Sequence, residues 1–296
     1  MPGTVVVVGE AIGEANLARL RQAHPDLEVR YCIEPEAYLA NVPDAEIIFS
    51  KQFPPGTLDL AQTLRWIQAG TAGVNHLLAA GIADRDIILT NARGAHGTPI
   101  AEQTLALIFA FANRLPTLIR AQDAQKHVAK QVIAEKFEVA GQTLLVIGLG
   151  DIGGTLAQKA KLLGMRVLGV RRTTEPFAGL DAQYTPEQLL EALPQADHVA
   201  LCLPLTDATT AIVGEQELRA MKPTAHIYNV GRGASIAPDA LLRALQEGWI
   251  AGAGLDCTDP EPLPADSPMW DLPNVILAQH TSGSSPYNAD RITQIF

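Results

Sequence analysis

The feature that most constrains the fold of this chain is a glycine-rich turn between an apolar strand and a helix. Residues 143–147, TLLVI, run into Gly148, Gly150 and Gly153, and a helical apolar pattern continues to residue 164. The first glycine permits a tight turn, the second lets a pyrophosphate approach the backbone, and the third lets helix and strand pack closely. The free N–H groups that begin such a helix attract phosphate. This stretch therefore predicts a dinucleotide-binding unit, with incidental glycines in a strand–turn–helix as the alternative.

The end of the next predicted strand, 166–172, carries two cations where an acid is expected. About 20 residues past the glycines, an NAD-binding unit has an Asp or Glu for the ribose 2′-OH. Arg171, Arg172 and Thr173 stand there instead. Guanidinium groups bind a 2′-phosphate bidentately, and the missing carboxylate removes the group that favours NAD. The sequence thus favours NADP(H), with NAD(H) still possible and a solvated arginine pair as the alternative.

Length, charge and cysteine content limit the classes of protein that this chain can belong to. Its 296 residues are comfortable for two domains, and a net charge of −10 argues against nucleic acid or an anionic membrane as partner. Cys32, Cys202 and Cys257 are too widely spaced for a metal motif, so we expect no metal and reduced thiols in the cytoplasm. No apolar stretch reaches the ~20 residues of a membrane helix, and the first residues read as a strand rather than a signal peptide.

Strand and helix patterns alternate along the whole chain. We expect strands within 4–10, 27–33, 45–50, 64–70, 86–93, 143–147, 166–172, 198–205, 225–233, 252–257 and 274–280, with helices such as 14–24 and 238–248 between them. This alternation is typical of parallel sheets covered by helices on both faces. We therefore predict an α/β protein of two Rossmann-like domains, a dinucleotide-binding domain and a smaller flavodoxin-like domain.

Residues 97–115 form a long helical pattern that is apolar on nearly every face. Thr98 is suited to cap this helix, and Pro99 is tolerated in its first turn. A helix without a polar face must be buried between layers. We expect it to bridge the two domains.

Five blocks together carry a resemblance to a known family. They are VIGLGDIG (146–153), LPLTDATT (203–210), IYNVGRGASI (227–236), GAGLDCTDPEPL (252–263) and LPNVILAQHTSG (272–283). In this order the chain resembles the D-2-hydroxyacid dehydrogenase family over almost its whole length, in the branch that is similar to glyoxylate–hydroxypyruvate reductases. The resemblance implies an NAD(P)-dependent oxidoreductase that reduces a 2-oxoacid to a D-2-hydroxyacid, and it implies a homodimer formed through the nucleotide domain.

The resemblance also implies two domains with different binding roles. Residues 1–93 would form the substrate domain, to which 285–296 return, and residues 94–284 would form the NAD(P)-binding Rossmann domain. Hinges are expected near 92–94 and near 283–286, so that closure excludes water from hydride transfer.

The family's catalytic residues fall on Arg232, Glu261 and His280, and each follows a predicted strand, where ligands bind in open α/β folds. Protonated His280 would give a proton to the ketone oxygen, and Glu261 would favour the imidazolium and fix its tautomer. Arg232 would bind the substrate carboxylate and polarise the carbonyl. From the residues alone, an ordinary histidine, a surface acid and a helix-approach arginine stay open. Formate-type relatives carry glutamine in place of the glutamate, so Glu261 argues against a formate-type protein.

The resemblance assigns the remaining contacts to both domains. Cofactor contacts are expected from Gly148, Gly150, Asp151, Ile152, Gly153, Arg171, Arg172, Thr173, Leu203, Pro204, Thr209, Val230 and Asp256. Among these, Asp256 would meet the nicotinamide carboxamide and Leu203 would cover the adenosine, although each can instead be structural. Substrate contacts are expected from Ala72 and Gly73, whose N–H groups would form an anion nest, and from Lys51, which can equally be a solvated lysine.

Some features separate this chain from the family pattern or leave alternatives. Ala278 and Gln279 stand where relatives usually have threonine and proline, so the histidine loop can be held differently. The chain ends in RITQIF, inside the final helix pattern, which puts the packing of that helix in question. His96 is expected to be structural. A relative that uses a phosphorylated or bulky 2-oxoacid, and a corepressor-like protein that binds the dinucleotide without turnover, remain alternatives, and the oxoacid itself is not identified.

Overall fold

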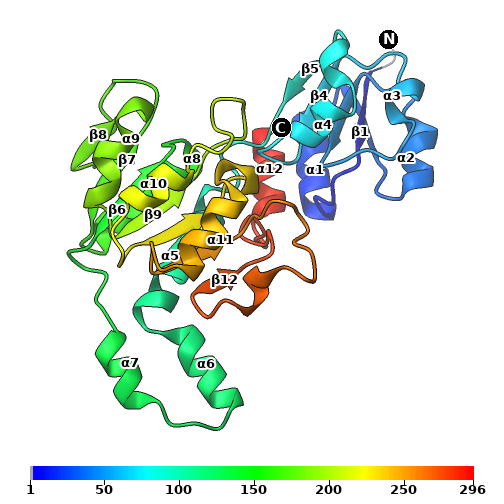
Figure 1. Cartoon of the computed structure of the whole chain (residues 1–296). Coiled ribbons are helices and arrows are strands. Elements are labelled where there is room, and N and C mark those ends of the chain that lie inside the picture. Colours follow the sequence, from blue (N-terminus) through cyan, green and yellow to red (C-terminus); the bar gives the residue numbers. More distant parts are fainter. Residues whose placement is uncertain (1–2) are drawn as a thin grey trace. The chain divides into compact units, whose positions relative to one another are not determined.

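The computed structural model describes residues 3–296, and these form two fully parallel sheets (Figure 1). One sheet has five strands and the other has seven. The chain divides into two compact units, one of residues up to His96 with Ser285–Phe296 and one of Gly97–Ser284. The predicted fold class, two Rossmann-like α/β domains with parallel sheets, is confirmed.

The first unit carries the five-stranded sheet in the order β2-β1-β3-β4-β5, which is the flavodoxin-like order. Its elements are β1 (Thr4–Val8), α1 (Glu14–Ala23), β2 (Leu27–Tyr31), α2 (Pro35–Asn41), β3 (Ile47–Ser50), α3 (Thr57–Leu60), β4 (Trp66–Ala69), α4 (Asn75–Ala79), a 3₁₀ turn (Ile82–Asp84), β5 (Ile88–Thr90) and α12 (Asn288–Ile295). The strands are shorter than the apolar patterns predicted because the flanking residues turn into the loops at the sheet edges.

The valines of β1 show why this sheet is covered on both faces. Side chains alternate along a strand, so Val6 and Val8 pack into one core with Leu17, while Val7 packs into the opposite core with Ile48. All of these side chains are buried. A run of four valines therefore requires a helical layer on each side, as a parallel sheet usually has.

The last helix, α12, packs against α1 within the first unit. The terminal Phe296 ring lies 4.7 Å from the ring of Phe49 and 5.4 Å from that of Trp66. Asn16 on α1 donates a hydrogen bond to the Asp290 carboxylate over 2.8 Å. The packing of this helix, which the sequence left in question, is thus that of an integral part of the core.

The second unit carries the seven-stranded sheet in the order β12-β11-β10-β9-β6-β7-β8. Its elements are α5 (Gly97–Ala112), α6 (Leu115–Asp123), α7 (Ala129–Glu135), β6 (Thr143–Ile147), α8 (Asp151–Leu162), β7 (Arg166–Val170), β8 (Ala182–Tyr184), α9 (Leu189–Ala192), β9 (His198–Leu201), α10 (Glu215–Ala220), β10 (His226–Asn229), α11 (Pro238–Gln246), β11 (Gly252–Leu255) and β12 (Val275–Leu277), with 3₁₀ turns at Pro186–Gln188, Leu193–Gln195, Gly233–Ser235 and Pro268–Asp271. Helices cover both faces and build two apolar cores.

Helix α5 corrects three details of the sequence prediction. It begins at Gly97, so Thr98 lies inside its first turn rather than before it. It ends at Ala112 rather than 115, because Arg114 adopts a left-handed φ of 56°. It packs along α8 and belongs to the core of the second unit, so burial within that unit, rather than a bridge, explains its apolar surface.

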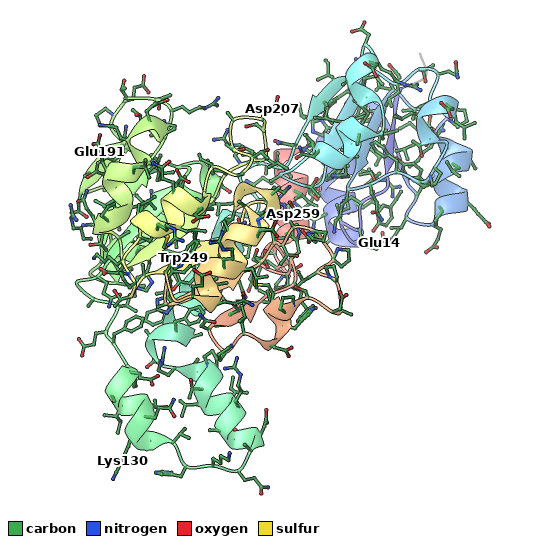
Figure 2. The ribbon with its side chains drawn as sticks, viewed as in Figure 1. Glu14, Lys130, Glu191, Asp207, Trp249 and Asp259 are labelled. Atoms are coloured by element: carbon green, nitrogen blue, oxygen red, sulfur yellow. The ribbon has the colours of Figure 1, made fainter. Side chains whose placement is uncertain are left out.

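Two short helices, α6 and α7, project from the body of the second unit, and the sequence reading missed them (Figure 1). Figure 2 shows Lys130 near their outer end. They expose the apolar side chains of Leu115, Leu118, Ile119 and Ile133. Within residues 3–296, no helix combines the length and the apolar character that crossing a bilayer requires.

Candidate active site

The glycine turn after β6 has the geometry that its spacing predicts. Gly148 adopts a left-handed φ of 95°, and its N–H donates to the Val170 carbonyl over 2.9 Å. A Cβ atom placed on Gly153 would lie 1.9 Å from the Gly148 carbonyl oxygen, so no other residue fits there. Gly150 immediately precedes α8, whose first N–H groups have no acceptor within the helix.

The side chains of the first turn of α8 are engaged in packing. Both carboxylate oxygens of Asp151 would lie 2.7 Å from a Cβ atom at Gly97, so this side chain rests on the start of α5. Ile152 is partly buried against the core that α5 contributes to. Only the main-chain N–H groups of this turn are therefore offered to a phosphate.

The basic pair after β7 has no competing carboxylate. The Arg171 guanidinium lies 5.8 Å from the centroid of the Phe177 ring and donates to the Glu175 carbonyl. Arg172 and Thr173 are exposed. Within residues 3–296, neither arginine forms an ion pair, so both charges remain available. The glycine turn, the N-terminus of α8 and these cations together fit a nicotinamide dinucleotide.

The three predicted catalytic residues follow three neighbouring parallel strands. Arg232 comes after β10, Glu261 after β11 and His280 after β12, and these strands are adjacent in the sheet. The carboxyl ends of parallel strands share one sheet edge, which brings residues distant in sequence together. His280 Nδ1 lies 2.6 Å from Glu261 Oε1, and both side chains are partly exposed. Because Nδ1 faces the carboxylate, Nε2 is left to face a reactant.

The backbone at His280 is held in an unusual conformation. Gln279 and His280 have φ values of 54° and 56°, a left-handed region that costs ordinary residues about 1 kcal/mol each. Asp256 holds this loop, because its carbonyl accepts the His280 N–H over 2.6 Å and its buried carboxylate accepts the N–H groups of Thr281 and Ser282. The Ser282 hydroxyl also donates to the Asp256 carboxylate. Asp256 therefore caps this loop, which is the structural role that the sequence left open for it.

The turn that carries Arg232 packs directly against the loop that carries Glu261. A Cβ atom at Gly233 would lie 1.9 Å from the Thr258 carbonyl oxygen, so glycine is required where the two loops meet. Asn229 Nδ2 donates to the Arg232 carbonyl over 2.8 Å and fixes the turn. The Arg232 guanidinium donates to the Gly231 carbonyl over 2.7 Å.

Cys257 joins these loops, although the sequence did not predict it as a site residue. Its thiol lies 3.4 Å from the Gly231 carbonyl oxygen and 3.8 Å from His280 Nδ1. Burial, with the negative charges of Asp256 and Glu261 nearby, raises the pKa of the thiol to about 12. The signal in the sequence was its position directly after the aspartate of the GAGLDC block.

The sequence spacing gave no metal motif, yet three potential ligands meet at this site. The donor atoms of Cys257, Glu261 and His280 all lie within 4.8 Å of one another. The thiol is buried and neutral, whereas the carboxylate is already paired with the imidazole. This arrangement matches an acid–base pair of Glu261 and His280, with the neutral Cys257 thiol packed beside His280 Nδ1.

The other residues assigned to the cofactor have clear structural contacts. A Cβ atom at Gly148 would lie 2.8 Å from Leu203 Cδ2, so Leu203 covers the glycine turn. The Thr209 hydroxyl donates to the Pro204 carbonyl over 2.7 Å and closes the loop that includes Asp207 (Figure 2). Val230 is buried in the core beside α5. Their contact with a cofactor stays a prediction.

The loop after β4 in the first unit offers two free donors. The Thr71 hydroxyl donates to the Gly73 carbonyl, and the Asn91 side chain donates to the Ala72 carbonyl over 2.7 Å. The N–H groups of Ala72 and Gly73 have no acceptor within residues 3–296. No residue of this loop has a positive φ, so the donors belong to an open turn rather than to the alternating backbone of a nest.

Two further predicted residues of the first unit differ in exposure. Lys51 follows β3, has an exposed side chain, and accepts a hydrogen bond on its carbonyl oxygen from His76 Nε2. His96 is half-buried and contacts Asn288 within the first unit, and its structural role stays a prediction.

A pair of buried histidines at the opposite edge of the larger sheet was also missed. His198 and His226 are the first residues of β9 and β10, and their rings stack 5.9 Å apart. His198 contacts the Tyr228 hydroxyl at 3.0 Å and Gln142 Oε1 at 2.6 Å. The available signal was a polar residue at the start of each apolar strand.

Burial keeps both of these imidazoles neutral. It lowers the pKa of His198 to about 4, against an opposing contribution from Asp197. It lowers the pKa of His226 to about 3, with further lowering from His198 and from Arg114. Neither ring therefore carries charge at neutral pH.

Comparison with known proteins decides which family this geometry belongs to. Residues 105–282 match the family described as "D-isomer specific 2-hydroxyacid dehydrogenase, NAD binding domain". The chain belongs to the D-isomer specific 2-hydroxyacid dehydrogenase family. As a member of this family it is an NAD(P)-dependent oxidoreductase.

Relatives of this dehydrogenase extend over nearly its whole length. It is 35% identical to a glyoxylate reductase of Thermococcus gammatolerans over 297 residues, which cover 96% of this chain and 87% of that protein. A family member from Aeromonas salmonicida has a solved structure with a TM-score of 0.87 and 32% identity, covering 100% of this chain and 94% of that one. A Xanthobacter autotrophicus dehydrogenase, solved with NADPH and MES, has a TM-score of 0.83 and 26% identity, covering 99% and 92%.

Proposed function

We propose that this dehydrogenase is an NADP-preferring reductase that converts a 2-oxoacid into a D-2-hydroxyacid. The observation that carries the proposal is the 2.6 Å contact between His280 Nδ1 and Glu261 Oε1 at the carboxyl edge of the sheet. A ketone reduction needs a hydride on carbon and a proton on oxygen, and the nicotinamide supplies the hydride when it is bound. The chain itself must supply the proton, the carboxylate binding and the exclusion of water.

His280 is the proton donor in this proposal. Glu261 accepts a hydrogen bond from His280 Nδ1–H and favours the charged imidazolium. The Nε2 proton is then left for the carbonyl oxygen of the substrate. Asp256 holds the main chain of His280, Thr281 and Ser282 by one hydrogen bond each, so the ring is positioned before a substrate arrives. The neutral Cys257 thiol fills the space behind Nδ1 without competing for the proton.

Donors for the substrate carboxylate are assigned in each unit by itself in this proposal. Arg232 supplies a guanidinium, which also polarises the carbonyl, and Ala72 and Gly73 supply their free N–H groups. We assign substrate binding to residues 1–93 with 285–296, and cofactor binding to residues 94–284. Relatives named glyoxylate reductase support a small 2-oxoacid as the substrate.

The decisive test is a panel assay of NADPH oxidation with glyoxylate, hydroxypyruvate, pyruvate, and branched and aromatic 2-oxoacids. We expect turnover with at least one small 2-oxoacid and a product of D configuration. A protein that binds NADPH tightly but oxidises it negligibly with the whole panel would instead be a dinucleotide-sensing protein. Turnover restricted to phosphorylated or bulky oxoacids would redefine the substrate class.

NADP preference is assigned to the basic end of β7. Arg171 and Arg172 carry unpaired charges there, and a family structure at 26% identity contains NADPH. Arg171→Asp should lower the NADP/NAD ratio of kcat/KM by about tenfold to hundredfold, because an ionised hydrogen bond is replaced by repulsion. Arg166→Asp, at the opposite end of the same strand, is the matched control and should leave the ratio unchanged. An unchanged ratio in both variants would contradict the assignment.

We also assign the protein to the cytoplasm as a homodimer. The three cysteines are unpaired and buried, which supports a reducing compartment.

Ile119 and Ile133 on the projecting helices are 59% and 73% exposed, and a cavity of about 650 Å³ at their base is lined partly by Phe109 and Phe137. Exposed apolar patches of this kind mark association sites. Replacing both isoleucines with lysine should shift the mass measured by light scattering from dimer to monomer.

A further inference from the structure

The smaller sheet has a topological switch point that the site described so far does not use. The chain passes from β1 to β2 on one side and then to β3 on the other side of β1. In open α/β sheets, ligands bind outside the carboxyl ends of the two strands where the order reverses. Those ends are continued by Gly9 and Glu10 after β1 and by Lys51 after β3.

Glu10 directs its carboxylate towards the loop that begins after β4. A Cβ atom at Gly70 would lie 2.4 Å from Glu10 Oε2 and 2.9 Å from its Cδ, so the carboxylate rests directly on this glycine. Gly70 leads into the turn in which Ala72 and Gly73 have free N–H groups. The chain therefore places an acceptor group beside a set of donors, in the same unit and at the same sheet edge.

One oxygen of this carboxylate is buried without a partner. Glu10 Oε2 accepts no hydrogen bond from any residue in the described part of the chain, although solvent scarcely reaches it. Burial raises the pKa of Glu10, and the Lys51 ammonium and main-chain N–H oppose that rise. A buried acceptor without a donor is costly, so such a group is usually satisfied by a protein donor, an ordered water or a ligand.

The chemistry of the neighbouring donors limits what Glu10 can recognise. Free N–H groups attract the substrate carboxylate, whereas Glu10 repels it, so the two must face different parts of one small molecule. The part that Glu10 faces must carry a hydrogen-bond donor. In a 2-oxoacid, the nearest position for such a donor is the third carbon.

We propose that Glu10 is a specificity residue that turns its carboxylate away from Gly70 and accepts a hydrogen bond from a hydroxyl group on the third carbon of the 2-oxoacid. This inference rests on the proposed function and adds to it a residue that selects the side chain of the substrate. An oxoacid whose third carbon bears only hydrogen leaves Oε2 without a donor and is disfavoured. Lys51 holds the carboxylate in this role rather than binding the substrate directly.

The test compares two substrates that differ by one hydroxyl group. NADPH oxidation by the full-length enzyme is measured with hydroxypyruvate, with pyruvate, and with glyoxylate, which has no third carbon. We expect the wild type to favour hydroxypyruvate over pyruvate, and Glu10→Ala to reduce that ratio of kcat/KM about tenfold or more. Glu10→Gln, which keeps the shape and one acceptor oxygen, should reduce it less, and the kcat/KM for glyoxylate should change little in either variant.

Glu14→Gln is the matched control, because Glu14 is exposed at the start of α1 (Figure 2). It should leave all three rates unchanged. A wild type that prefers pyruvate, or Glu10 variants in which all three substrates lose the same factor, would overturn the inference and indicate a structural role. If the wild type reduces none of the three substrates, the proposed function itself is wrong, and the inference about Glu10 is wrong as well.

Discussion

The two edges of the seven-stranded sheet place histidines in opposite environments. At the carboxyl edge, His280 is partly exposed, contacts a carboxylate, and has a left-handed backbone. At the amino edge, His198 and His226 are buried in regular strands, stack on each other, and stay neutral. The same side chain thus pairs with a carboxylate at one edge and stacks on another ring at the other. Strand direction explains this difference in environment, because the loops at the carboxyl ends of the strands carry Glu261, the acid that pairs with His280.

The largest expected effect comes from exchanging the exposed histidine. His280→Ala removes the proton donor, and we expect kcat/KM with the preferred 2-oxoacid to fall about a thousandfold. The dissociation constant of NADPH, measured by fluorescence titration, should stay within about twofold because the ring does not hold the dinucleotide.

His226→Asn is the matched change at the amino edge, and it should leave kcat nearly unaltered. If the two variants lost activity equally, or if His280→Ala also abolished NADPH binding, the contrast between catalytic and structural histidines would not hold.

The partner of His280 should give an intermediate effect. Glu261→Gln keeps the shape of the side chain but loses the charge that favours the imidazolium, so kcat should fall about tenfold to hundredfold. The KM of the 2-oxoacid should change less than kcat, because Glu261 contacts His280 rather than the substrate in this proposal. Glu191→Gln, an exposed change on α9 (Figure 2), should alter neither quantity. An unchanged kcat in Glu261→Gln would place Glu261 outside the proton transfer.

The smallest effect on activity is expected from the buried histidines, which act on stability at acid pH instead. The folded-state pKa values of about 4 for His198 and about 3 for His226 lie below the unfolded value of about 6.5, so the unfolded chain binds more protons in between. Their contribution to stability is complete above about pH 6.5. It is lost as pH falls towards 4, by about 1.4 kcal/mol per pH unit for each ring.

Urea unfolding of the wild type and His226→Asn at pH 7.5, 6 and 5 measures this contribution. The variant has one titrating ring fewer, so its free energy of unfolding should fall less steeply with pH than that of the wild type. Carboxylates with lowered pKa values, such as Asp181 and Asp197, contribute equally to both proteins and cancel in the difference. Parallel curves for the two proteins would mean that His226 is already protonated or solvated when folded.

The sequence alone was sufficient for what is encoded over short distances. The strand, glycine turn and helix from 143 to 164 follow from steric needs of neighbouring residues, since Gly153 must approach the Gly148 carbonyl and Gly148 must adopt a positive φ. The alternation of apolar strands and helices similarly determined the fold class. Arg171 and Arg172 could be placed because they directly follow a strand whose end was evident.

Only the tertiary structure decided what depends on residues far apart in the chain. Glu261 and His280 meet because β11 and β12 are neighbours, and Cys257 comes between the loops because Gly233 allows them to touch. The environment of Glu10 likewise depends on Gly70, sixty residues away in sequence. Burial and pairing are properties of the folded chain, since they depend on which strands lie side by side. For the same reason, no local pattern could distinguish the histidine that faces a carboxylate from the two that face each other.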